Sequence, residues 1–321
     1  MIYVEGFEVN FGWFPDGTPA LTDLGPFFGM LDEMSRTFDA LGNKTWYFTD
    51  TLSIAWIFGN YSEMPIVDML TRHIKDLGYK VELTMPYIPN ARMDRKKNRI
   101  TEVFTLKYFA EWLNSLGFEK VMVLDPHSPA SYMINHLEIM DVRSFHQRVI
   151  DEVKPDYIVF PDKGAQERYA NSIPGYKFFY GQKVRNWKTG KIEGLDIINP
   201  ACVPASEYKG KRVLVIDDIC SRGGTFTYTA PELEKMGFGE LVLAITHCEP
   251  TIELGDVFKH YVKVYTTDSM HYALQTKKGD AAKKIHVIPY GAQYPYGGEM
   301  SVDEMRATCN LPAKEERGCA G

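Results

Sequence analysis

Short apolar runs alternate along this sequence with stretches of helical periodicity, and this alternation constrains the fold more than any other feature. The runs are brief and mostly rich in Val, Ile and Leu, as buried strands are. Strands that alternate with helices form a parallel sheet with helices on both faces. The sequence therefore predicts an α/β fold whose strands span residues 80–86, 120–125, 156–161, 212–217, 240–246 and 284–289.

Two helices between these strands have recognisable ends. The first is predicted over residues 62–77, with Ser62 as its N-cap and Gly78 just beyond its last turn. The second is predicted over residues 102–116, with Thr101 as its cap. Its apolar residues recur at helical spacing and comprise Val103, Phe104, Phe109, Leu113 and Leu116.

The chain contains two blocks that are similar to each other. "EKVMVLDPHSPAS" (119–131) and "GKRVLVIDDICSRGG" (210–224) each have a basic residue, a four-residue apolar strand, an aspartate and a polar loop. A chain of 321 residues is also long for one domain. We therefore expect two similar α/β domains, residues 1–145 and 146–321.

Composition and charge limit the possible partners. The net charge of −6 argues against a nucleic-acid-binding surface, while anionic small substrates stay possible if cations gather at one site. No run approaches the roughly 20 apolar residues that a membrane span needs, and the start, "MIYVEGFEVNFGW", lacks the features of a signal peptide. The five scattered cysteines suit a reducing compartment. We expect a cytoplasmic protein that binds neither nucleic acid nor membrane.

The stretch "RVLVIDDICSRGGTFTYTA" (212–230) holds the strongest candidate site. Asp217 and Asp218 end a predicted strand, and ligands of open α/β sheets bind beyond the carboxyl ends of the strands. The small residues that follow open a helix, whose N-terminal N–H groups favour an anion. The carboxylates would then take sugar hydroxyls, and a phosphate would bind at Ser221, Gly223, Gly224 and Thr225. The alternative is an acidic strand end followed by an ordinary turn.

This stretch resembles the phosphoribosyl pyrophosphate loop of phosphoribosyltransferases and ribose-phosphate pyrophosphokinases, in which two acids, two apolar residues, Asp or Ser, and Thr precede Gly-Gly-Thr. Four further segments are similar to motifs of the pyrophosphokinases, which phosphoribosyltransferases do not have in this order. They are "MPYIPNARMDRKKN" (85–98), "EVFTLKYFAEWLNSLGFEKVMVLDPHS" (102–128), "FPDKGAQERY" (160–169) and "GQKVRN" (181–186). The resemblance, over roughly residues 10–290, implies two tandem phosphoribosyltransferase-type domains, each a mainly parallel sheet flanked by helices.

The resemblance also implies a Mg²⁺-dependent diphosphokinase. In that family the anomeric hydroxyl of ribose 5-phosphate attacks the β-phosphorus of ATP, which gives phosphoribosyl pyrophosphate and AMP. Catalysis of this kind relies on positioning and charge neutralisation. By resemblance, Lys183 and Arg185 are the catalytic cations of a lid, within a loop from Gly175 to Lys191 that we expect to be mobile. A solvated basic loop is the alternative.

Metal and nucleotide roles follow from the same resemblance. His127 and Asp162 would help to hold Mg²⁺ at the triphosphate. For His127 the alternative is a strand-end histidine bonded to a backbone carbonyl. The nucleotide-binding residues that the family motifs imply are Phe14, Asp16, Arg92, Asp94, Arg95 and Lys96. Arg95 and Lys96 fit a solvated basic run equally well.

Three of the departures from the family pattern bear on the choice of nucleotide and substrate. Met93 replaces a Gln beside Arg92, and Thr18 replaces a Glu in the segment "FPDGTPA" (14–20), which leaves the nucleotide preference open. Arg222 stands where Thr is usual. A guanidinium suits phosphate oxygens, so Arg222 either strengthens binding of the 5-phosphate or engages a second phosphate. We expect ribose 5-phosphate as the substrate; the alternative is ADP-ribose, for which relatives associated with NAD salvage give a precedent.

Two other functional classes compete with this interpretation. A phosphoribosyltransferase would share the loop from Asp217 to Thr225 but would need neither ATP nor the lid cations. A non-catalytic regulatory relative usually loses the lid cations or the Asp pair, and all four residues are present here. The resemblance further implies a homodimer or homohexamer, in which the segment around Phe14 reaches the nucleotide of a neighbouring subunit.

Overall fold

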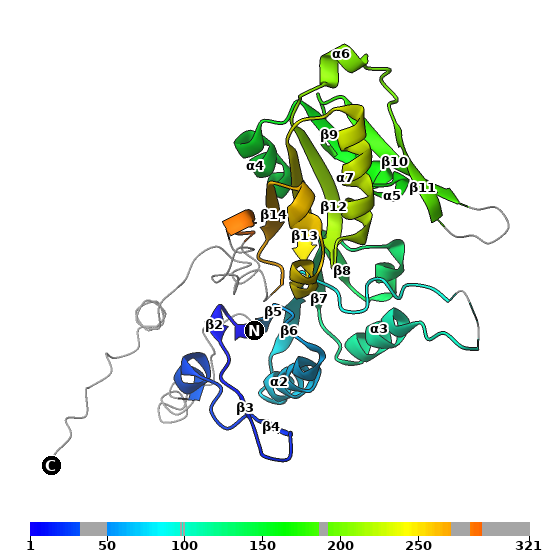
Figure 1. The fold of residues 1–321 in the computed structure, drawn as a ribbon. Helices are drawn as coiled ribbons and strands as arrows, with labels where there is room; N and C mark the ends of the chain where they lie inside the picture. The colour runs from blue at the N-terminus through cyan, green and yellow to red at the C-terminus, as the bar shows by residue number, and fades with distance from the viewer. Residues whose placement is uncertain (33–49, 97, 99, 186–191, 271–282, 291–321) are drawn as a thin grey trace.

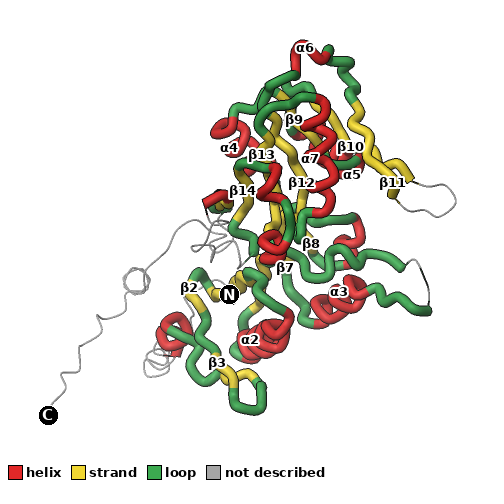
Figure 2. Tube along the Cα trace, in the orientation of Figure 1, coloured by secondary structure: helices red, strands yellow, loops and turns green. Residues whose placement is uncertain are grey.

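Two mainly parallel sheets, one from each half of the chain, make up the fold (Figure 1, Figure 2). The computed structural model describes residues 1–32, 50–96, 98, 100–185, 192–270 and 283–290. A third sheet has only two short strands, β3 (Gly12–Trp13) and β4 (Pro19–Ala20), which form a hairpin near the N-terminus.

The first sheet has the strand order β2-β1-β5-β6-β7-β8. Its strands are β1 (Ile2–Val4), β2 (Phe7–Glu8), β5 (Thr51–Trp56), β6 (Lys80–Thr84), β7 (Lys120–Leu124) and β8 (Leu137–Met140). The four strands from β5 to β8 are parallel, and β1 is antiparallel to both of its neighbours.

The second sheet has the strand order β11-β10-β9-β12-β13-β14-β15. Its strands are β9 (Tyr157–Phe160), β10 (Phe178–Arg185), β11 (Ile192–Ile198), β12 (Val213–Cys220), β13 (Leu241–Cys248), β14 (Lys263–Thr267) and β15 (Ile285–Ile288). All neighbours are parallel except β11, which forms an antiparallel hairpin with β10.

Helices connect many of the strands. The α-helices are α2 (Met64–Asp76), α3 (Thr105–Ser115), α4 (Arg143–Val153), α5 (Lys163–Tyr169), α6 (Ala205–Tyr208), α7 (Gly224–Met236) and α8 (Val257–His260). Short 3-10 helices are η1 (Tyr61–Glu63), η2 (Pro129–Met133), η3 (Ala170–Ser172) and η4 (Pro250–Leu254). Among the described helices, none is long and apolar enough to cross a membrane.

The second sheet is buried on both faces because its central strands are apolar at successive positions. In β12, Val213 and Val215 face one core, while Leu214 and Ile216 face the other, since neighbouring side chains of a strand point to opposite faces. Helices α7 and α8 cover the first of these faces, and α4 and α5 cover the second. The first sheet packs its main core against α2 and α3.

The predicted fold class is confirmed, and so are all six predicted strands, which are β6, β7, β9, β12, β13 and β15. The strands that the apolar runs did not reveal include β2, β8 and β11, which lie at the edges of the two sheets. In the edge strand β8, for example, Leu137 and Met140 are half-buried and Glu138 and Ile139 are exposed. Such a strand needs no continuous apolar run, because only part of its surface is covered.

Both predicted helices are present, but their predicted caps are wrong. Ser62 lies within η1, whose cap is Asn60, and not at the start of α2. Thr101 lies in a turn before α3, where its backbone N–H donates to the side chain of Asn98 at 3.1 Å. In both places the predicted cap lies in a separate turn before the helix, where its own backbone N–H donates to an asparagine side chain, Asn60 or Asn98.

The segment from Gly175 to Lys191, expected to have little regular structure, is in large part a strand. Its residues Phe178–Arg185 form β10, which pairs with β9 on one side and β11 on the other. Backbone hydrogen bonds on both sides fix a strand even where the side chains show little periodicity. Residues 186–191 lie outside the described part of the chain.

The predicted domain boundary between residues 145 and 146 stays a prediction. It falls within α4, which packs on the second sheet through Phe145 and Val149. The chain passes from one sheet to the other between β8 and β9.

Candidate active site

The carboxyl-terminal parts of β7 and β12, one from each sheet, meet at the candidate site. Asp217 and Asp218, the acidic pair, lie in β12, which continues beyond them to Cys220. His127 follows β7, and its Nδ1 lies 2.6 Å from Oδ2 of Asp218, a side chain that is 2% exposed. The two halves of the chain are therefore in direct contact at the acidic pair.

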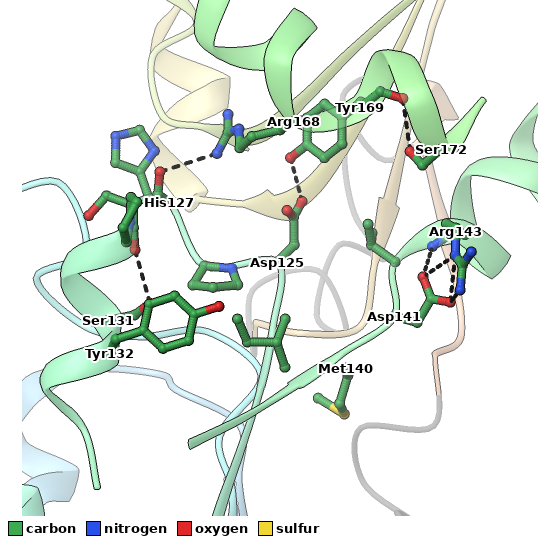
Figure 3. A pocket seen from close by; sticks show the side chains of 15 residues that line it. Asp125, His127, Ser131, Tyr132, Met140, Asp141, Arg143, Arg168, Tyr169 and Ser172 are labelled. Carbon is green, nitrogen blue, oxygen red and sulfur yellow. Dashed lines mark hydrogen bonds and ion pairs between the residues drawn. The ribbon is translucent and has the colours of Figure 1, made fainter. Parts of the chain in front are cut away.

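Arg168, in the last turn of α5, bridges the acidic pair. Its Nη2 donates to Oδ1 of Asp217 at 3.0 Å, and its Nη1 donates to Oδ2 of Asp218 at 2.8 Å. The same Nη1 lies 3.3 Å from the carbonyl oxygen of His127 (Figure 3). One guanidinium thus holds two carboxylates and the backbone of the opposite sheet.

The surroundings separate the ionisation of the two carboxyl groups. Burial raises the pKa of Asp217 well above its ordinary value, and the charge of Asp218 adds to this effect. Burial also acts to raise the pKa of Asp218, but hydrogen bonds from His127 and Arg168 outweigh it and hold that pKa below its ordinary value. Asp218 is therefore the anionic member of the pair, and Asp217 binds a proton more readily.

A second, more deeply buried contact joins the sheets beside the acidic pair. Asp125 follows β7 with a φ of 42°, and its Oδ2 accepts hydrogen bonds from the hydroxyl of Tyr169, at 2.7 Å, and from that of Thr246 (Figure 3). Nε2 of His247, in β13, lies 3.0 Å from the carbonyl oxygen of Leu124. Because these buried polar groups have partners across the interface, they fix the two sheets to each other.

A pocket of about 550 Å³ borders the partners of the acidic pair (Figure 3). Asp125, His127 and Arg168 form part of its wall, whereas Asp217 and Asp218 are not among its lining residues. The remainder of the wall is largely apolar or aromatic and includes Pro126, Pro129, Tyr132, Ile139, Met140 and Val142. The pocket is thus a neighbour of the acidic pair and not its binding site.

The loop after β12 turns into α7 at a glycine that no other residue could replace without strain. Gly223 has a φ of +76°, and a Cβ at this position would overlap with the side chain of Val257. On the other side of the loop, a Cβ at Gly255 would overlap with the carbonyl of Arg222. Helix α7 begins at Gly224, so its first backbone N–H groups lie at this turn, an arrangement that suits a phosphate.

The other predicted residues of this loop differ in exposure. Oγ of Ser221 lies 2.9 Å from Oγ1 of Thr251, and Thr225 is half-buried in the first turn of α7. Arg222 is exposed, and within the described residues its guanidinium takes part in no ion pair. Its charge is therefore available beside the glycine turn.

Only one of the predicted nucleotide-binding residues after β6 reaches the second sheet. Arg92 forms an ion pair with Glu249, whose backbone N–H donates to the carbonyl of Cys220 at the end of β12. Asp94 is half-buried, Nε of Arg95 lies 3.6 Å from its carboxylate, and Lys96 is exposed. The structure thus brings Arg92 close to the loop after β12.

Phe14 and Asp16 lie in the exposed turn between β3 and β4. The carboxylate of Asp16 accepts hydrogen bonds from the backbone N–H of Thr18 at 3.0 Å and from its hydroxyl at 2.7 Å. Figure 1 shows this hairpin well away from β12. Within one chain, therefore, these two residues do not join the acidic pair.

Lys183 and Arg185 belong to β10, where Lys183 pairs with Leu195 of β11. Their side chains lie outside the described part of the structure. Their catalytic role stays a prediction.

The two predicted Mg²⁺ ligands each contact a neighbour in the chain. Oδ1 of Asp162 caps α5 by accepting the N–H of Ala165 at 3.0 Å, while Nδ1 of His127 is taken by Asp218. The charge of Asp162 adds to the rise in the pKa of Asp217 that burial and Asp218 cause. Across the described residues, no three His, Cys, Asp or Glu side chains converge closely enough to hold a metal ion by themselves.

Comparison with known proteins shows which proteins this chain resembles. Residues 130–277 match the phosphoribosyl transferase domain. The chain is 31% identical over 186 residues to a ribose-phosphate pyrophosphokinase of Saccharolobus solfataricus, an alignment that covers 56% of this chain and 61% of that relative. It is 26% identical over 237 residues to a ribose-phosphate pyrophosphokinase of Chlorobaculum tepidum, with 70% and 68% of the two chains covered. The chain is a divergent relative of the ribose-phosphate pyrophosphokinases.

The fold of this chain is also similar to that of a solved structure. Phosphoribosylpyrophosphate synthetase from Mycobacterium smegmatis matches it with a TM-score of 0.57 at 17% identity, over 82% of this chain and 91% of the other. At that identity the likeness extends to the fold alone. In sequence, the chain spans about three fifths of the Saccharolobus solfataricus relative and of a further one from Pyrococcus furiosus, both at 61%.

Sequence reasoning overlooked three residues of this pyrophosphokinase-like site, namely Asp125, Arg168 and Tyr169. Arg168 lies 50 positions from Asp218, and Tyr169 lies 44 from Asp125. Local periodicity carries no information over such distances. The usable signal was chemical, because two adjacent carboxylates in a buried strand require a nearby cation.

Proposed function

We propose that this protein is a ribose-phosphate pyrophosphokinase, which transfers the β,γ-diphosphoryl group of ATP to the anomeric hydroxyl of ribose 5-phosphate. The observation that carries the proposal is the acidic pair of β12, which contacts His127 of the other sheet and is followed by the glycine turn into α7. Carboxylates accept hydrogen bonds from sugar hydroxyls, and a helix N-terminus favours a phosphate. The carboxyl-terminal end of β12 and the turn after it thus offer a partner for each end of the sugar phosphate.

In the proposed reaction, the anomeric oxygen bonds to the β-phosphorus of ATP while the bond from that phosphorus to the oxygen bridging to the α-phosphorus breaks. AMP leaves with the bridging oxygen, and the anomeric hydroxyl loses its proton. The protein contributes mainly by holding the two reactants in line. The acidic pair would orient the sugar, and Arg92, whose partner in the free protein is Glu249, would bind the triphosphate.

The residues near the acidic pair fit a Mg²⁺ ion that binds together with ATP. Mg²⁺ prefers oxygen ligands, keeps several water molecules and binds substrate phosphates, so that one or two protein carboxylates suffice. Asp162 would supply such a carboxylate, and its charge acts on the pKa of Asp217. We assign His127 an outer position, through water, because its Nδ1 is engaged by Asp218. Mg²⁺ bound there would neutralise charge on the transferred diphosphoryl group.

The test is the formation of AMP from ATP and Mg²⁺ with ribose 5-phosphate as acceptor, followed by mass spectrometry of the sugar product. We expect one AMP for each sugar product formed, and a product heavier than ribose 5-phosphate by one diphosphoryl group. A phosphoribosyltransferase would instead release pyrophosphate when given a nucleobase and phosphoribosyl pyrophosphate, without AMP from ATP. The absence of both reactions would favour a non-catalytic relative.

ADP-ribose is the second candidate acceptor, and Arg222 is the observation that favours it. Arg222 is exposed beside the glycine turn and belongs to no ion pair within the described residues. It could therefore bind a second phosphate attached to the 5-phosphate. Running the same assay with ADP-ribose decides between the two acceptors, and Arg222→Thr should lower activity on ADP-ribose more than on ribose 5-phosphate.

The lid cations provide a further test of the proposed chemistry. We expect Lys183→Ala to lower kcat by roughly 10³-fold, the lower range for a cation that stabilises a phosphoryl transition state, with a much smaller change in KM. Lys177→Ala is the matched control, because Lys177 is an exposed lysine just before β10 that pairs with Glu207. Equal changes in kcat and KM for Lys183→Ala would contradict the lid role.

We further infer a homodimer or homohexamer, because the β3–β4 hairpin, whose turn holds Phe14 and Asp16, lies well away from β12 of its own chain (Figure 1). In this proposal the β3–β4 hairpin completes the nucleotide site of a neighbouring subunit. Light scattering gives the oligomeric state, and mixing an Asp217→Asn chain with an Asp16→Ala chain tests the shared site. Activity recovered on mixing would support it.

A further inference from the structure

Arg168 is placed to control the geometry of the acidic pair. Its two Nη atoms bind different carboxylates, and one of them also contacts the carbonyl of His127. Its Nε is buried without a hydrogen-bond partner among the described residues, so the two Nη atoms set its orientation. The ring of Tyr169 lies beneath the guanidinium, with Cζ 5.1 Å from the ring centroid.

We propose that Arg168 is a positioning residue, which holds Asp217 and Asp218 in the orientation in which they receive the hydroxyls of the sugar. This inference rests on the proposed function, since the sugar is the ligand that the acidic pair is proposed to bind. It adds a residue from α5 to a site whose other parts come from β7 and β12. Arg168 itself acts through the carboxylates and does not need to touch the substrate.

The charge of the pair makes such a residue necessary. Two adjacent carboxylates in a buried strand repel each other, and without a cation they would turn apart or take up a proton. His127 contacts Asp218 alone, whereas Arg168 contacts both members of the pair. The guanidinium therefore fixes the distance between the two carboxylates, which sets the spacing at which they can meet neighbouring hydroxyls.

Contact between the two sheets does not by itself account for the position and hydrogen bonds of Arg168. Asp125, with Tyr169 and Thr246, already joins the sheets through fully buried hydrogen bonds. By contrast, the side chain of Arg168 is 27% exposed and lies at the edge of a pocket. A residue that served packing alone would not require a planar fork with one nitrogen on each carboxylate.

The experiment compares Arg168→Ala, Arg168→Lys and Arg143→Ala with the wild type, in full-length protein checked for folding by circular dichroism. Kinetics are measured with ribose 5-phosphate and ATP varied separately, and binding of ribose 5-phosphate is measured by calorimetry without ATP. Arg143 is the matched control, because it lines the same pocket but pairs with Asp141. Each Arg168 variant is also assayed with millimolar guanidinium chloride added.

We expect Arg168→Ala to raise the KM and the dissociation constant for ribose 5-phosphate by about 10- to 100-fold, the worth of hydrogen bonds to charged groups. The KM for ATP should change by less than about threefold, which is less than the loss of one hydrogen bond to a charged group would cause. Added guanidinium should restore part of the loss, because it can occupy the vacated position between the carboxylates. Arg168→Lys should fall between Ala and wild type, since one ammonium cannot span both carboxylates in the same way.

Several outcomes would overturn the inference. These are an unchanged affinity for ribose 5-phosphate in both Arg168 variants, equal losses for the sugar phosphate and ATP, or a loss in Arg143→Ala as large as in Arg168→Ala. If the wild-type protein binds ribose 5-phosphate but forms no AMP, the proposed function is refuted. The binding measurements on the Arg168 variants then decide the role of Arg168. A wild-type protein that neither binds nor converts the sugar phosphate would refute both. If Arg168→Ala does not fold, Arg168→Lys and its response to guanidinium decide.

Discussion

The ends of β7 and β12 are similar in sequence but serve different purposes. Each strand is apolar and leads into an aspartate, Asp125 in one and Asp217 in the other. After β7, a φ of 42° at Asp125 turns the carboxylate toward the second sheet, where it binds the hydroxyls of Tyr169 and Thr246. After Asp217, β12 continues through Asp218 and ends at the glycine turn into α7.

The partners of these carboxylates explain the difference. Tyr169 and Thr246 are 2% and 0% exposed, so no ligand can replace them at Asp125. The side chains of Arg168 and His127, which bind the acidic pair, are 27% and 35% exposed. The β12 end is thus the one where substrate groups can approach. The same strand pattern therefore yields a structural carboxylate or a candidate binding carboxylate, depending on the partner.

Asp125→Ala should have the largest effect on stability. The change leaves the buried hydroxyls of Tyr169 and Thr246 without an acceptor, at about 1–3 kcal/mol each, so we expect the free energy of unfolding to fall by about 2–6 kcal/mol. Urea denaturation measures this loss. Asp217→Asn should show the opposite balance, with weaker binding of ribose 5-phosphate and a smaller loss of stability. The comparison would break down if the two variants exchanged these effects.

Gly223→Ala should cost somewhat less, about 2–4 kcal/mol of unfolding free energy, because it combines an unfavourable φ with overlap on Val257. The turn should shift, and affinity for the sugar phosphate should fall with it. Gly224→Ala is the control, since a Cβ there meets no atom within 4 Å. Thermal melting and calorimetry with ribose 5-phosphate measure both effects. Equal behaviour of the two variants would contradict a special role for Gly223.

His146→Phe should change how stability depends on pH. Burial lowers the pKa of His146 to about 4 from 6.5, against the charges of Asp125 and Asp141, which act to raise it. Between these values the unfolded chain binds a proton that the folded chain does not. The free energy of unfolding should therefore fall, as pH drops from 6.5 to 4, by up to about 3 kcal/mol from this residue.

This effect belongs to the β7 side of the comparison, because the ring of His146 packs at 5.0 Å on that of Tyr169, which holds Asp125. Urea denaturation across the pH range, for the wild type and the Phe variant, isolates the contribution as a difference. Parallel profiles for the two proteins would rule it out.

The smallest effect is expected from the two serines that follow the strands. Ser221→Ala removes the hydrogen bond to Thr251 in the loop after β12, and Ser128→Ala removes the side chain that accepts the N–H of Ala130 at the start of η2. Each should cost about 0.5–1.5 kcal/mol of stability. Only Ser221→Ala should also weaken binding of ribose 5-phosphate in calorimetry. A similar weakening in Ser128→Ala would mean that both loops take part in binding.

Much of the fold could be predicted from the sequence because burial imposes a visible pattern. The six apolar runs became strands. The pattern is strongest in β9, β12 and β13, which are buried at almost every position because both faces of the sheet are covered there. The edge strand β8 and the inner strand β10 could not be found in this way, because their pairing depends on neighbours far along the chain. The caps at Ser62 and Thr101 were wrong because both residues are held in turns before the helices, where Asn60 and Asn98 accept their backbone N–H groups.

The sequence by itself determined six strands of the two main sheets, the acidic pair and the glycine turn, since each of these depends on residues next to one another in the chain. Only the tertiary structure decided which carboxylate is structural and which belongs to the candidate site. That distinction depends on Tyr169, Thr246 and Arg168, which lie 44, 121 and 50 positions from the carboxylates that they bind. Hydrogen bonds and ion pairs require atoms about 3 Å apart, and only folding brings residues so distant in sequence to that separation.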